Sequence, residues 1–279
     1  MQVGGTLYVV ATPIGNREDL SPRAARILCT AATVYAEDTR SLGRLGATVA
    51  GVVRSLFDHN EAARVDEVLA RLAAGEDVAI VSEAGTPGVS DPGYRVVRAA
   101  VAAGLRVAAV PGPSAVVAAM VVSGLPTDAF RFGGFLPRTS AERRRALREV
   151  ERERATLVWF DSPHRIGATL TDVEAVLGDR PVAVARELTK LHETVYRGRA
   201  SEVRAALGDA VKGEVTLVVG GRLEEGASPE EQAAALAQAV QAALARGASV
   251  KDAADEAAGA LGVSRKAAYR LALRLSRRG

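Results

Sequence analysis

Four polar segments carry the side chains of this sequence that could do chemistry, and each directly follows an apolar run. They hold carboxylates, arginines and one lysine, a mixture that suits a polar substrate and a proton transfer. The segments are Glu37-Asp38-Thr39-Arg40, Ser82–Asp91, Asp161–Arg165 and Arg186–Glu193. Because strand ends converge in an α/β fold, we expect the four segments to line one cleft. For any single member the alternative is an ion pair or a cap, as Asp161 could be for a helix after Pro163.

Two loops rich in glycine and proline point to the same edge of a sheet. The first follows the apolar run Val78–Val81 and places Gly85, Pro87, Gly88, Pro92 and Gly93 within nine residues. The second, Pro111-Gly112-Pro113-Ser114-Ala115, follows the apolar run 107–110. One such loop could be an ordinary turn, but two at the ends of successive strands predict a ligand site.

The order of the expected elements predicts two α/β parts and a helical tail. Residues 1–124 alternate strands and helices, which is typical of a mostly parallel sheet covered on both faces. Residues 125–224 have more strands per helix and predict a mixed sheet. Beyond a polar linker, Glu224–Pro229, residues 225–279 are alanine-rich, and the break at Leu261-Gly262-Val263-Ser264 favours a helix-turn-helix-like module. Strands are expected at residues 6–11, 33–36, 78–81, 107–110, 130–135, 156–160, 181–185, 194–198 and 215–219.

Composition and missing motifs exclude several classes of protein. No apolar run reaches 18 residues and no cationic segment precedes an apolar one at the start, so we expect a cytoplasmic protein without a membrane span. The single cysteine, Cys29, excludes an internal disulfide and is expected to be buried in a helix. No Walker A loop, strand-linked G-x-G-x-x-G or G-x-S-x-G motif occurs, and the scattered histidines imply no metal.

Positive charge gathers in two segments although the net charge is only +3. Arg138–Arg154 holds seven arginines against four glutamates, so a solvated helix face explains it at least as well as a binding surface. Arg265–Arg278 holds six basic residues and no acidic one, which favours an anionic partner such as a phosphate backbone.

At these residues the sequence resembles the tetrapyrrole (corrin/porphyrin) methylase superfamily, and within it the bacterial small-subunit ribosomal RNA (cytidine-2′-O)-methyltransferases. The helical tail, with LGVSRKAAY, is also similar to that subfamily's carboxyl-terminal extension. Where the family has S-D-A-G-T-P and E-S-P-H-R, this chain has Glu83 and Asp161, which keep a carboxylate. The matching segments are LYVVATPIGNREDLSPRA (7–24), AEDTR (36–40), SEAGTPGVSDPG (82–93), VPGPSA (110–115), GFLPR (134–138), SPHR (162–165) and RELTKLHE (186–193).

The resemblance implies a homodimeric, S-adenosylmethionine-dependent enzyme with its cofactor between two domains. It implies 2′-O-methylation of a cytidine near the decoding centre, in small-subunit (16S) ribosomal RNA or the assembled subunit. Carried over by motif, the cofactor contacts are Pro13, Ile14, Gly15, Gly85, Thr86, Pro87, Val89, Ser114 and Ala115, with backbone contacts near Phe160, Asp161, Glu187 and Thr216.

Catalytic and RNA-binding roles follow as hypotheses. A ribose hydroxyl needs a base, for which Glu187 and Glu193 are candidates, with Lys190 as an electrostatic partner. His164 and His192 are further possible bases. Arg40 and Arg165 would clamp phosphates. The tail residues expected to grip RNA are Arg265, Lys266, Arg270 and Arg274.

Two alternatives remain open. A tetrapyrrole (precorrin or uroporphyrinogen) methyltransferase would share the fold but would not need the basic tail. A non-catalytic, RNA-binding assembly factor would bind RNA without binding S-adenosylmethionine, and the two small-residue loops argue against it.

Overall fold

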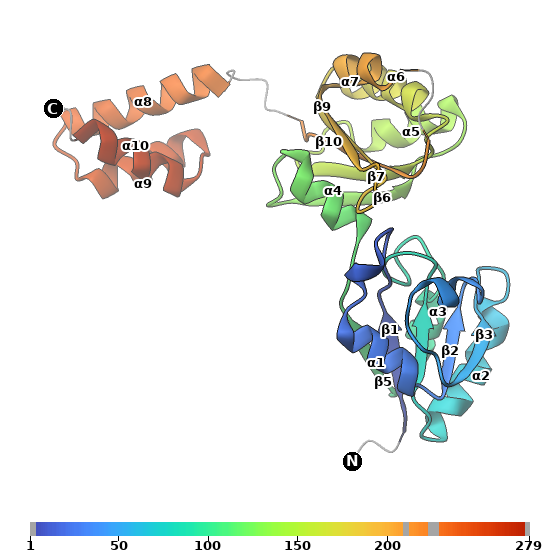
Figure 1. The fold of residues 1–279 in the computed structure, drawn as a ribbon. Coiled ribbons are helices and arrows are strands. Elements are labelled where there is room, and N and C mark those ends of the chain that lie inside the picture. Colours follow the sequence, from blue (N-terminus) through green and yellow to red (C-terminus); the bar gives the residue numbers. More distant parts are fainter. Residues whose placement is uncertain (1–3, 209–211, 223–228, 277–279) are drawn as a thin grey trace. The chain divides into compact units, whose positions relative to one another are not determined.

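The computed structural model describes residues 4–208, 212–222 and 229–276 of the chain, with the side chains of 229–232 excepted. The chain divides into two compact units, one ending at Arg222 and one beginning at Leu223 (Figure 1). Among the described residues, the larger unit has two separate five-stranded sheets and the smaller unit has three helices. The expected linker at 224–229 falls, up to residue 228, outside the described residues, and the division at 124/125 stays a prediction.

The first sheet is parallel throughout, as expected, with strand order β3-β2-β4-β1-β5. Helix α1 (Pro22–Thr30) packs against one face, and α2 (Glu61–Ala73) and α3 (Tyr94–Ala102) pack against the other. The strands are β1 (Thr6–Val10), β2 (Thr33–Ala36), β3 (Val52–Ser55), β4 (Val78–Val81) and β5 (Arg106–Val110). Two short 3₁₀ helices, η1 (Arg17–Asp19) and η2 (Ser41–Arg44), follow β1 and β2.

The second sheet is mixed, as expected from the larger number of strands per helix in this part of the chain. Its order is β6-β7-β10-β8-β9, with β6 parallel to β7 and the other neighbours antiparallel. Its strands are β6 (Phe130–Phe135), β7 (Thr156–Asp161), β8 (Pro181–Arg186), β9 (Thr194–Arg199) and β10 (Val215–Val219). Helices α5 (Ser140–Glu149), α6 (Ile166–Leu177) and α7 (Ala200–Leu207) cover one face. The opposite face is covered by α4 (Ala115–Ser123), the helix that follows the last strand of the first sheet (Figure 1).

The smaller unit has its own apolar core. Helices α8 (Pro229–Ala245), α9 (Val250–Leu261) and α10 (Arg265–Ser276) meet around Val240, Ala257 and Ala268. Ser249 caps α9 by accepting a hydrogen bond from the Asp252 amide at 3.2 Å. Gly262, with a φ of +64°, ends α9 in the left-handed conformation, within the break predicted at 261–264.

One expectation about the core was wrong. Cys29 is exposed, because the buried face of α1 is made by Ala24, Ile27 and Leu28 and the next residue turns away by 100°. Within the described ranges, no helix is both long and apolar enough to cross a membrane.

Candidate functional site

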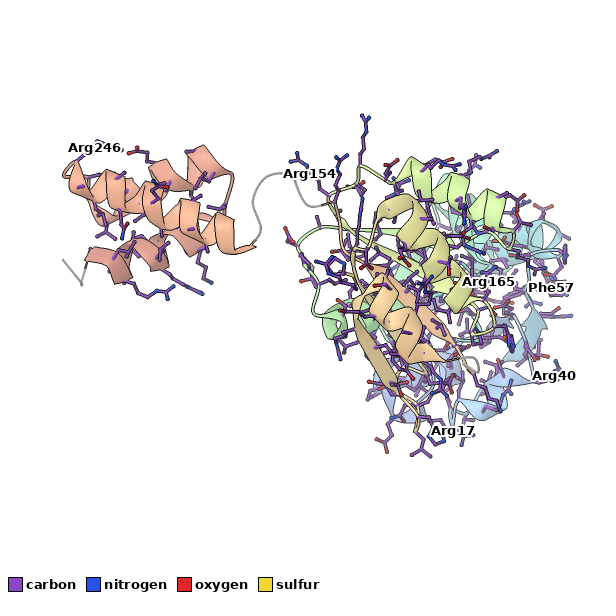
Figure 2. All side chains as sticks on the ribbon, turned by 90° about the horizontal axis from the view of Figure 1, so that it is seen from above. Arg17, Arg40, Phe57, Arg154, Arg165 and Arg246 are labelled. Atoms are coloured by element: carbon purple, nitrogen blue, oxygen red, sulfur yellow. The ribbon has the colours of Figure 1, made fainter. Side chains whose placement is uncertain are left out.

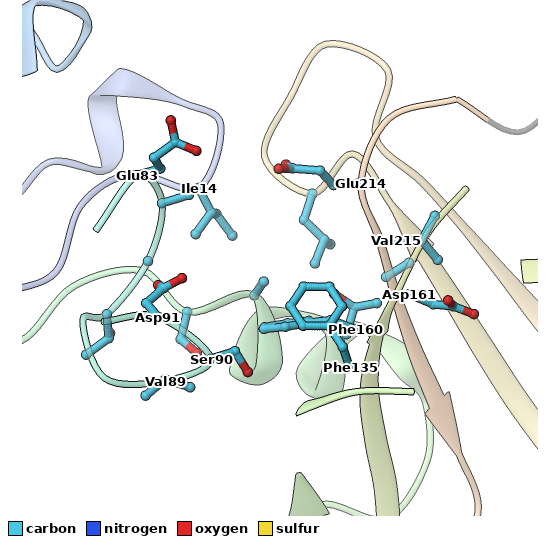
Figure 3. Close-up of a pocket in the computed structure, with 18 of the residues that line it drawn as sticks. Ile14, Glu83, Val89, Ser90, Asp91, Phe135, Phe160, Asp161, Glu214 and Val215 are labelled. Carbon is cyan, nitrogen blue, oxygen red and sulfur yellow. The ribbon is translucent and has the colours of Figure 1, made fainter. Parts of the chain in front are cut away.

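A cavity of about 300 Å³ lies where loops from both sheets of the larger unit meet (Figure 3). Loops that follow β1, β2, β4 and β5 provide one side, and strand ends of the second sheet provide the other. A volume of this size is at the lower end of small-molecule sites. The lining residues are Ile14, Glu37, Glu83, Ala84, Gly85, Thr86, Val89, Ser90, Asp91, Ser114, Ala115, Phe135, Phe160, Asp161, Ala185, Leu188, Glu214, Val215 and Thr216.

The four polar segments do converge on this cavity. The first contributes Glu37, the second residues 83–86 and 89–91, the third Asp161 and the fourth Leu188. Convergence follows from topology, because the loops at the carboxyl ends of parallel strands share one edge of the sheet.

Backbone geometry explains why the loop after β4 is built from small residues. The Thr12 amide donates to the Gly85 carbonyl at 2.8 Å, and the Gly85 amide donates back at 3.1 Å. This pair of bonds holds the loops after β1 and β4 together. Gly85 has a φ of +81°, a conformation that residues with a side chain disfavour. Because glycine has no side chain, the backbone itself lines the cavity at this position.

Three carboxylates give one side of the cavity its electrostatic character. Burial, helped by the nearby charges of Glu37, Asp58 and Glu83, raises the pKa of Asp91 to about 6. Burial also raises the pKa of Glu37, with the charge of Glu83 acting in the same direction. Carboxylates that repel one another in a partly desolvated site favour a cationic ligand.

The other side of the cavity carries an aromatic cluster, and Asp161 and Glu214 also line it. The Phe160 ring lies 4.9 Å from that of Phe132 and 5.3 Å from that of Phe135, as measured between centroids. Ile14 and Leu188 complete this side, and Figure 3 shows Ile14 directed across the cavity from the first sheet. The cavity therefore has an apolar wall, made by Ile14, Phe160 and Leu188, and an acidic wall, made by Glu37, Glu83 and Asp91.

Comparison with known proteins places the chain in a family. The sequence profile described as Tetrapyrrole (Corrin/Porphyrin) Methylases matches residues 6–204. A protein of Mycobacterium tuberculosis named Ribosomal RNA small subunit methyltransferase I is 47% identical over 261 residues, which cover 92% of this chain and 90% of the relative. The chain belongs to the tetrapyrrole methylase family.

Other relatives extend the match over the helical unit. A Synechocystis protein with the same name is 40% identical and covers 99% of this chain and 100% of its own length. One from Escherichia coli O157:H7 is 42% identical over 96% of this chain and 95% of its own. The resemblance inferred from the motifs is thereby confirmed.

Solved structures show the same fold. The methyltransferase CobJ superposes with a TM-score of 0.60 at 19% identity, over 81% of this chain and 98% of its own. A Thermus thermophilus uroporphyrin-III C-methyltransferase complexed with S-adenyl homocysteine superposes with a TM-score of 0.53 at 24% identity. The superposition covers 78% of this chain and 97% of that one. These confirm the α/β class with two sheets, to which this methylase adds α8–α10.

Most of the predicted cofactor contacts of this methylase line the cavity. They are Ile14, Gly85, Thr86, Val89, Ser114, Ala115, Phe160, Asp161 and Thr216. Pro13, Gly15, Pro87 and Glu187 are not among the described lining residues. All of these assignments stay predictions. The chemistry of the donor set suits S-adenosylmethionine, because its sulfonium and ammonium suit the acidic wall and its adenine suits the apolar one.

The loop after β8 holds three of the proposed catalytic residues in a strained arrangement. Glu187 and Thr189 have φ values of +53° and +66°, in the left-handed region that residues other than glycine avoid. Hydrogen bonds hold the loop: Lys190 Nζ donates to Glu187 Oε1 at 2.8 Å and to Glu214 Oε2 at 2.7 Å. The Thr189 amide donates to Glu193 Oε2 at 2.6 Å.

The same contacts set the charges of that loop. The hydrogen bond from Lys190 lowers the pKa of Glu187, which weakens this carboxylate as a base. Burial tends to lower the pKa of Lys190, but its bonds to Glu187 and Glu214 outweigh burial and raise it. Lys190 is therefore a fixed cation beside Glu214, which lines the cavity.

The two proposed phosphate clamps differ in availability. Arg40 pairs with Asp38 but its side chain is 88% exposed, and Figure 2 shows it at the surface. Arg165 is mostly buried, donating to the carboxylate of Asp161 and, at 3.0 Å, to the carbonyl of Leu136. Arg40 is thus open to solvent, whereas Arg165 is held against the cavity wall by Asp161 and Leu136.

The arginines of the basic segment 138–154 differ in burial. Arg143 is 3% exposed and its guanidinium pairs with Asp172 at 2.6 Å, so it faces the core. In the helical unit, Arg265, Lys266, Arg270 and Arg274 are all exposed, with Arg265 3.6 Å from Asp255.

Several lining residues were not among the predicted contacts. Glu37, Glu83 and Asp91 belong to the polar segments but were given no role. Phe135, Leu188 and Glu214 were missed, although the doublet Gly133-Gly134 inside a strand was a usable signal for a bulge beside Phe135. No group of three or more histidine, cysteine, aspartate or glutamate residues suited to a metal occurs in the described part of the chain.

Proposed function

We propose that this methylase transfers the methyl group of S-adenosylmethionine to the ribose 2′-hydroxyl of a cytidine in small-subunit (16S) ribosomal RNA, near the decoding centre. One observation carries the proposal. Relatives named for small-subunit ribosomal RNA methylation match at 40–47% identity over 92–99% of the chain. The likeness to tetrapyrrole-modifying enzymes, by contrast, extends to the fold alone.

The cavity supports S-adenosylmethionine as the donor. The bare backbone at Gly85, the small residues Ser114 and Ala115, and the wall at Phe160 would hold it. When bound, it supplies an electrophilic methyl group on a sulfonium. Glu37 and Asp91 stabilise a cation there, and that preference is lost when the sulfonium becomes a neutral thioether.

The chain's own task is then to position the acceptor and to take its proton. A bond forms between the ribose oxygen and the methyl carbon, the carbon–sulfur bond breaks, and the hydroxyl proton passes to a base. Glu187 or Glu193 as base, Lys190 as cation, and Arg40 and Arg165 as phosphate contacts remain the proposed set, with His164 and His192 as further possible bases. Of these, Lys190 bonds directly to Glu214 and Arg165 to Asp161, and both of these carboxylates line the cavity.

The helical unit supports a substrate as large as the assembled subunit. Its α10 presents Lys266, Arg270 and Arg274 to solvent, which suits a phosphate backbone. We further propose a cytoplasmic homodimer. Val117 and Val121 on α4 support the dimer, because their apolar side chains are exposed.

The test is to incubate the protein with methyl-labelled S-adenosylmethionine and small ribosomal subunits, naked small-subunit RNA or tetrapyrrole precursors. Label on a ribose, at a linkage resistant to alkaline cleavage, establishes the proposed reaction. Label on a tetrapyrrole keeps the fold and overturns the substrate. RNA binding without donor binding would instead indicate a non-catalytic factor.

A further inference from the structure

Phe135 occupies an unusual place at the rim of the cavity. It lines the cavity, yet 61% of its surface is exposed. A large aromatic side chain in a soluble protein is normally buried more fully than this. One side of its ring packs near Phe160, with ring centroids 5.3 Å apart and planes at 58°, and the other side is open.

A β-bulge places the ring there. The pairing of β6 with β7 runs regularly to Phe132 and Val158, then shifts before Phe135 pairs with Phe160. Without the shift, Phe132 and Phe135 would point to opposite faces of the sheet; with it, both rings meet Phe160. Gly134 supplies the required φ of +68°.

The segment around the ring is fixed rather than loose. A Cβ atom at Gly133 would lie 2.2 Å from Nε1 of Trp159, so the backbone there is tightly packed. The next residue after the ring, Leu136, is buried, and its carbonyl accepts the 3.0 Å hydrogen bond from Arg165. An exposed ring on a braced backbone is preorganised for a flat partner.

The opposite rim belongs to the first sheet. Val89 lines the cavity and is partly exposed, and Ser90 holds a φ of +62°. Figure 3 shows Val89 and Ser90 on one side and the rings of Phe135 and Phe160 on the other. The rim therefore presents two exposed apolar side chains, Val89 and Phe135, just outside the acidic wall that suits the donor.

We propose that Phe135 is a binding site for the nucleobase of the target nucleotide, which stacks on the open face of the ring while its ribose enters the cavity. The inference rests on the proposed RNA 2′-O-methylation. A ribose cannot reach a recessed methyl group while its base stays stacked in the RNA, and unstacked bases bind to aromatic side chains. Stacking is tolerant of base identity, so this site positions the nucleotide and leaves sequence selection to contacts elsewhere.

The test compares Phe135→Leu and Phe135→Tyr with Phe130→Leu. Leucine keeps apolar volume without a stacking face, tyrosine keeps the face, and Phe130 is an exposed phenylalanine of the same strand that is not among the described lining residues. The readouts are KM and kcat for small ribosomal subunits, the Kd of S-adenosylmethionine by calorimetry, and Tm. Phe135→Ala is added to enlarge the effect.

We expect Phe135→Leu to raise KM for subunits about tenfold, with the Kd of S-adenosylmethionine and Tm unchanged, and Phe135→Tyr to restore KM. Phe130→Leu should match the parent. An unchanged KM in Phe135→Leu overturns the site, and a matching rise in the Kd of S-adenosylmethionine reassigns the ring to the donor's adenine. Failure of the parent protein to label ribose is a separate outcome, which overturns the proposed function itself.

Discussion

Gly15 and Lys190 lie so close together that a Cβ atom added at Gly15 would be 2.4 Å from Cγ of Lys190. Gly15 belongs to the loop after β1 of the first sheet, and Lys190 to the loop after β8 of the second. The carbonyl of Leu188, 3.0 Å from the same position, completes the contact. Two of the proposed site loops, from different sheets, are therefore packed against each other beside the cavity.

Replacing Gly15 with alanine tests this contact. The added methyl group must displace the stem of Lys190 and press on the Leu188 backbone, so we expect the free energy of unfolding to fall by about 1–3 kcal/mol. We also expect weaker binding of S-adenosylmethionine, because Leu188 lines the cavity. Chemical denaturation and calorimetry measure the two effects.

A matched control is Gly167→Ala in the first turn of α6, where an added Cβ meets nothing within 4 Å. That variant should be neutral or gain up to about 1 kcal/mol, because alanine is the better helix former. Equal stability of the two variants would show that the loops do not touch in solution.

Asp91 should make both stability and donor binding depend on pH. Its pKa rises from an ordinary 3.8 to about 6, mainly through burial, so ionising it destabilises the folded protein. That penalty is absent below pH 3.8, grows as the pH rises towards 6, and is constant above it. Asp91→Asn should therefore be more stable than the parent at pH 8, with the difference shrinking below pH 6, as thermal unfolding across pH can measure.

The same substitution should weaken binding of the cationic donor while changing the affinity of the neutral product, S-adenosylhomocysteine, much less. In the parent, the ratio of donor to product affinity should rise between pH 5 and pH 7, as Asp91 ionises. The exposed Asp128 offers a control, Asp128→Asn, without either effect. A donor affinity that Asp91→Asn leaves intact would place the cation elsewhere.

Arg143 should behave as a structural residue although it lies in a basic segment. Its guanidinium and the carboxylate of Asp172 are each 3% exposed, and Arg143→Met would leave that buried carboxylate with Arg144 and Ser140 as its remaining partners. We expect a loss of about 1.5–3 kcal/mol in the free energy of unfolding, the usual range for losing a hydrogen bond to a charged group. Arg145→Met, at an exposed site of the same helix, should change it by about 0.5 kcal/mol at most. Similar stability of the two variants would contradict the buried pair.

Patterns that depend on neighbours in sequence were sufficient for most of the fold. Strand β4 was predictable because four consecutive apolar residues are buried, and α9 because Ser249 and Gly262 cap it. Strand β3 was missed because it is a short edge strand whose side chains are largely exposed, so it leaves no apolar run. The burial predicted for Cys29 was wrong because the helical phase of α1 turns Ala24, Ile27 and Leu28 inward and Cys29 outward.

The candidate site was predictable where it depends on motifs, and less so where it depends on tertiary contact. The loop at Gly85 carries its own signal in glycine and proline spacing. Phe135 reaches the cavity because of the bulge in the pairing of β6 with β7. Glu214, just before β10, is held there by its bond to Lys190 in the loop after β8. Burial of Arg143 beside Asp172, 29 residues away, likewise depends on how α5 packs on α6.

The exposed face of α10 should supply RNA affinity without touching the cofactor site. Lys266, Arg270 and Arg274 recur at helical spacing on this face, and Tyr269 is exposed among them. Reversing two of these charges, in Arg270→Glu with Arg274→Glu, removes two phosphate contacts and adds repulsion. We expect at least tenfold weaker binding to small ribosomal subunits at 100 mM salt, and a slope of log affinity against log salt that is shallower by about two.

The apolar core of the helical unit faces away from these charges, so its stability should not change. A double reversal on α1, Arg23→Glu with Arg26→Glu, makes the same change in net charge at exposed positions of the larger unit and controls for long-range electrostatics. The Kd of S-adenosylmethionine should equal that of the parent in both variants. If the α10 variant binds subunits as tightly as the α1 variant does, the basic face is a solvated helix surface and the RNA is gripped elsewhere. If it alone loses affinity, the tail is what joins this methylase to its RNA.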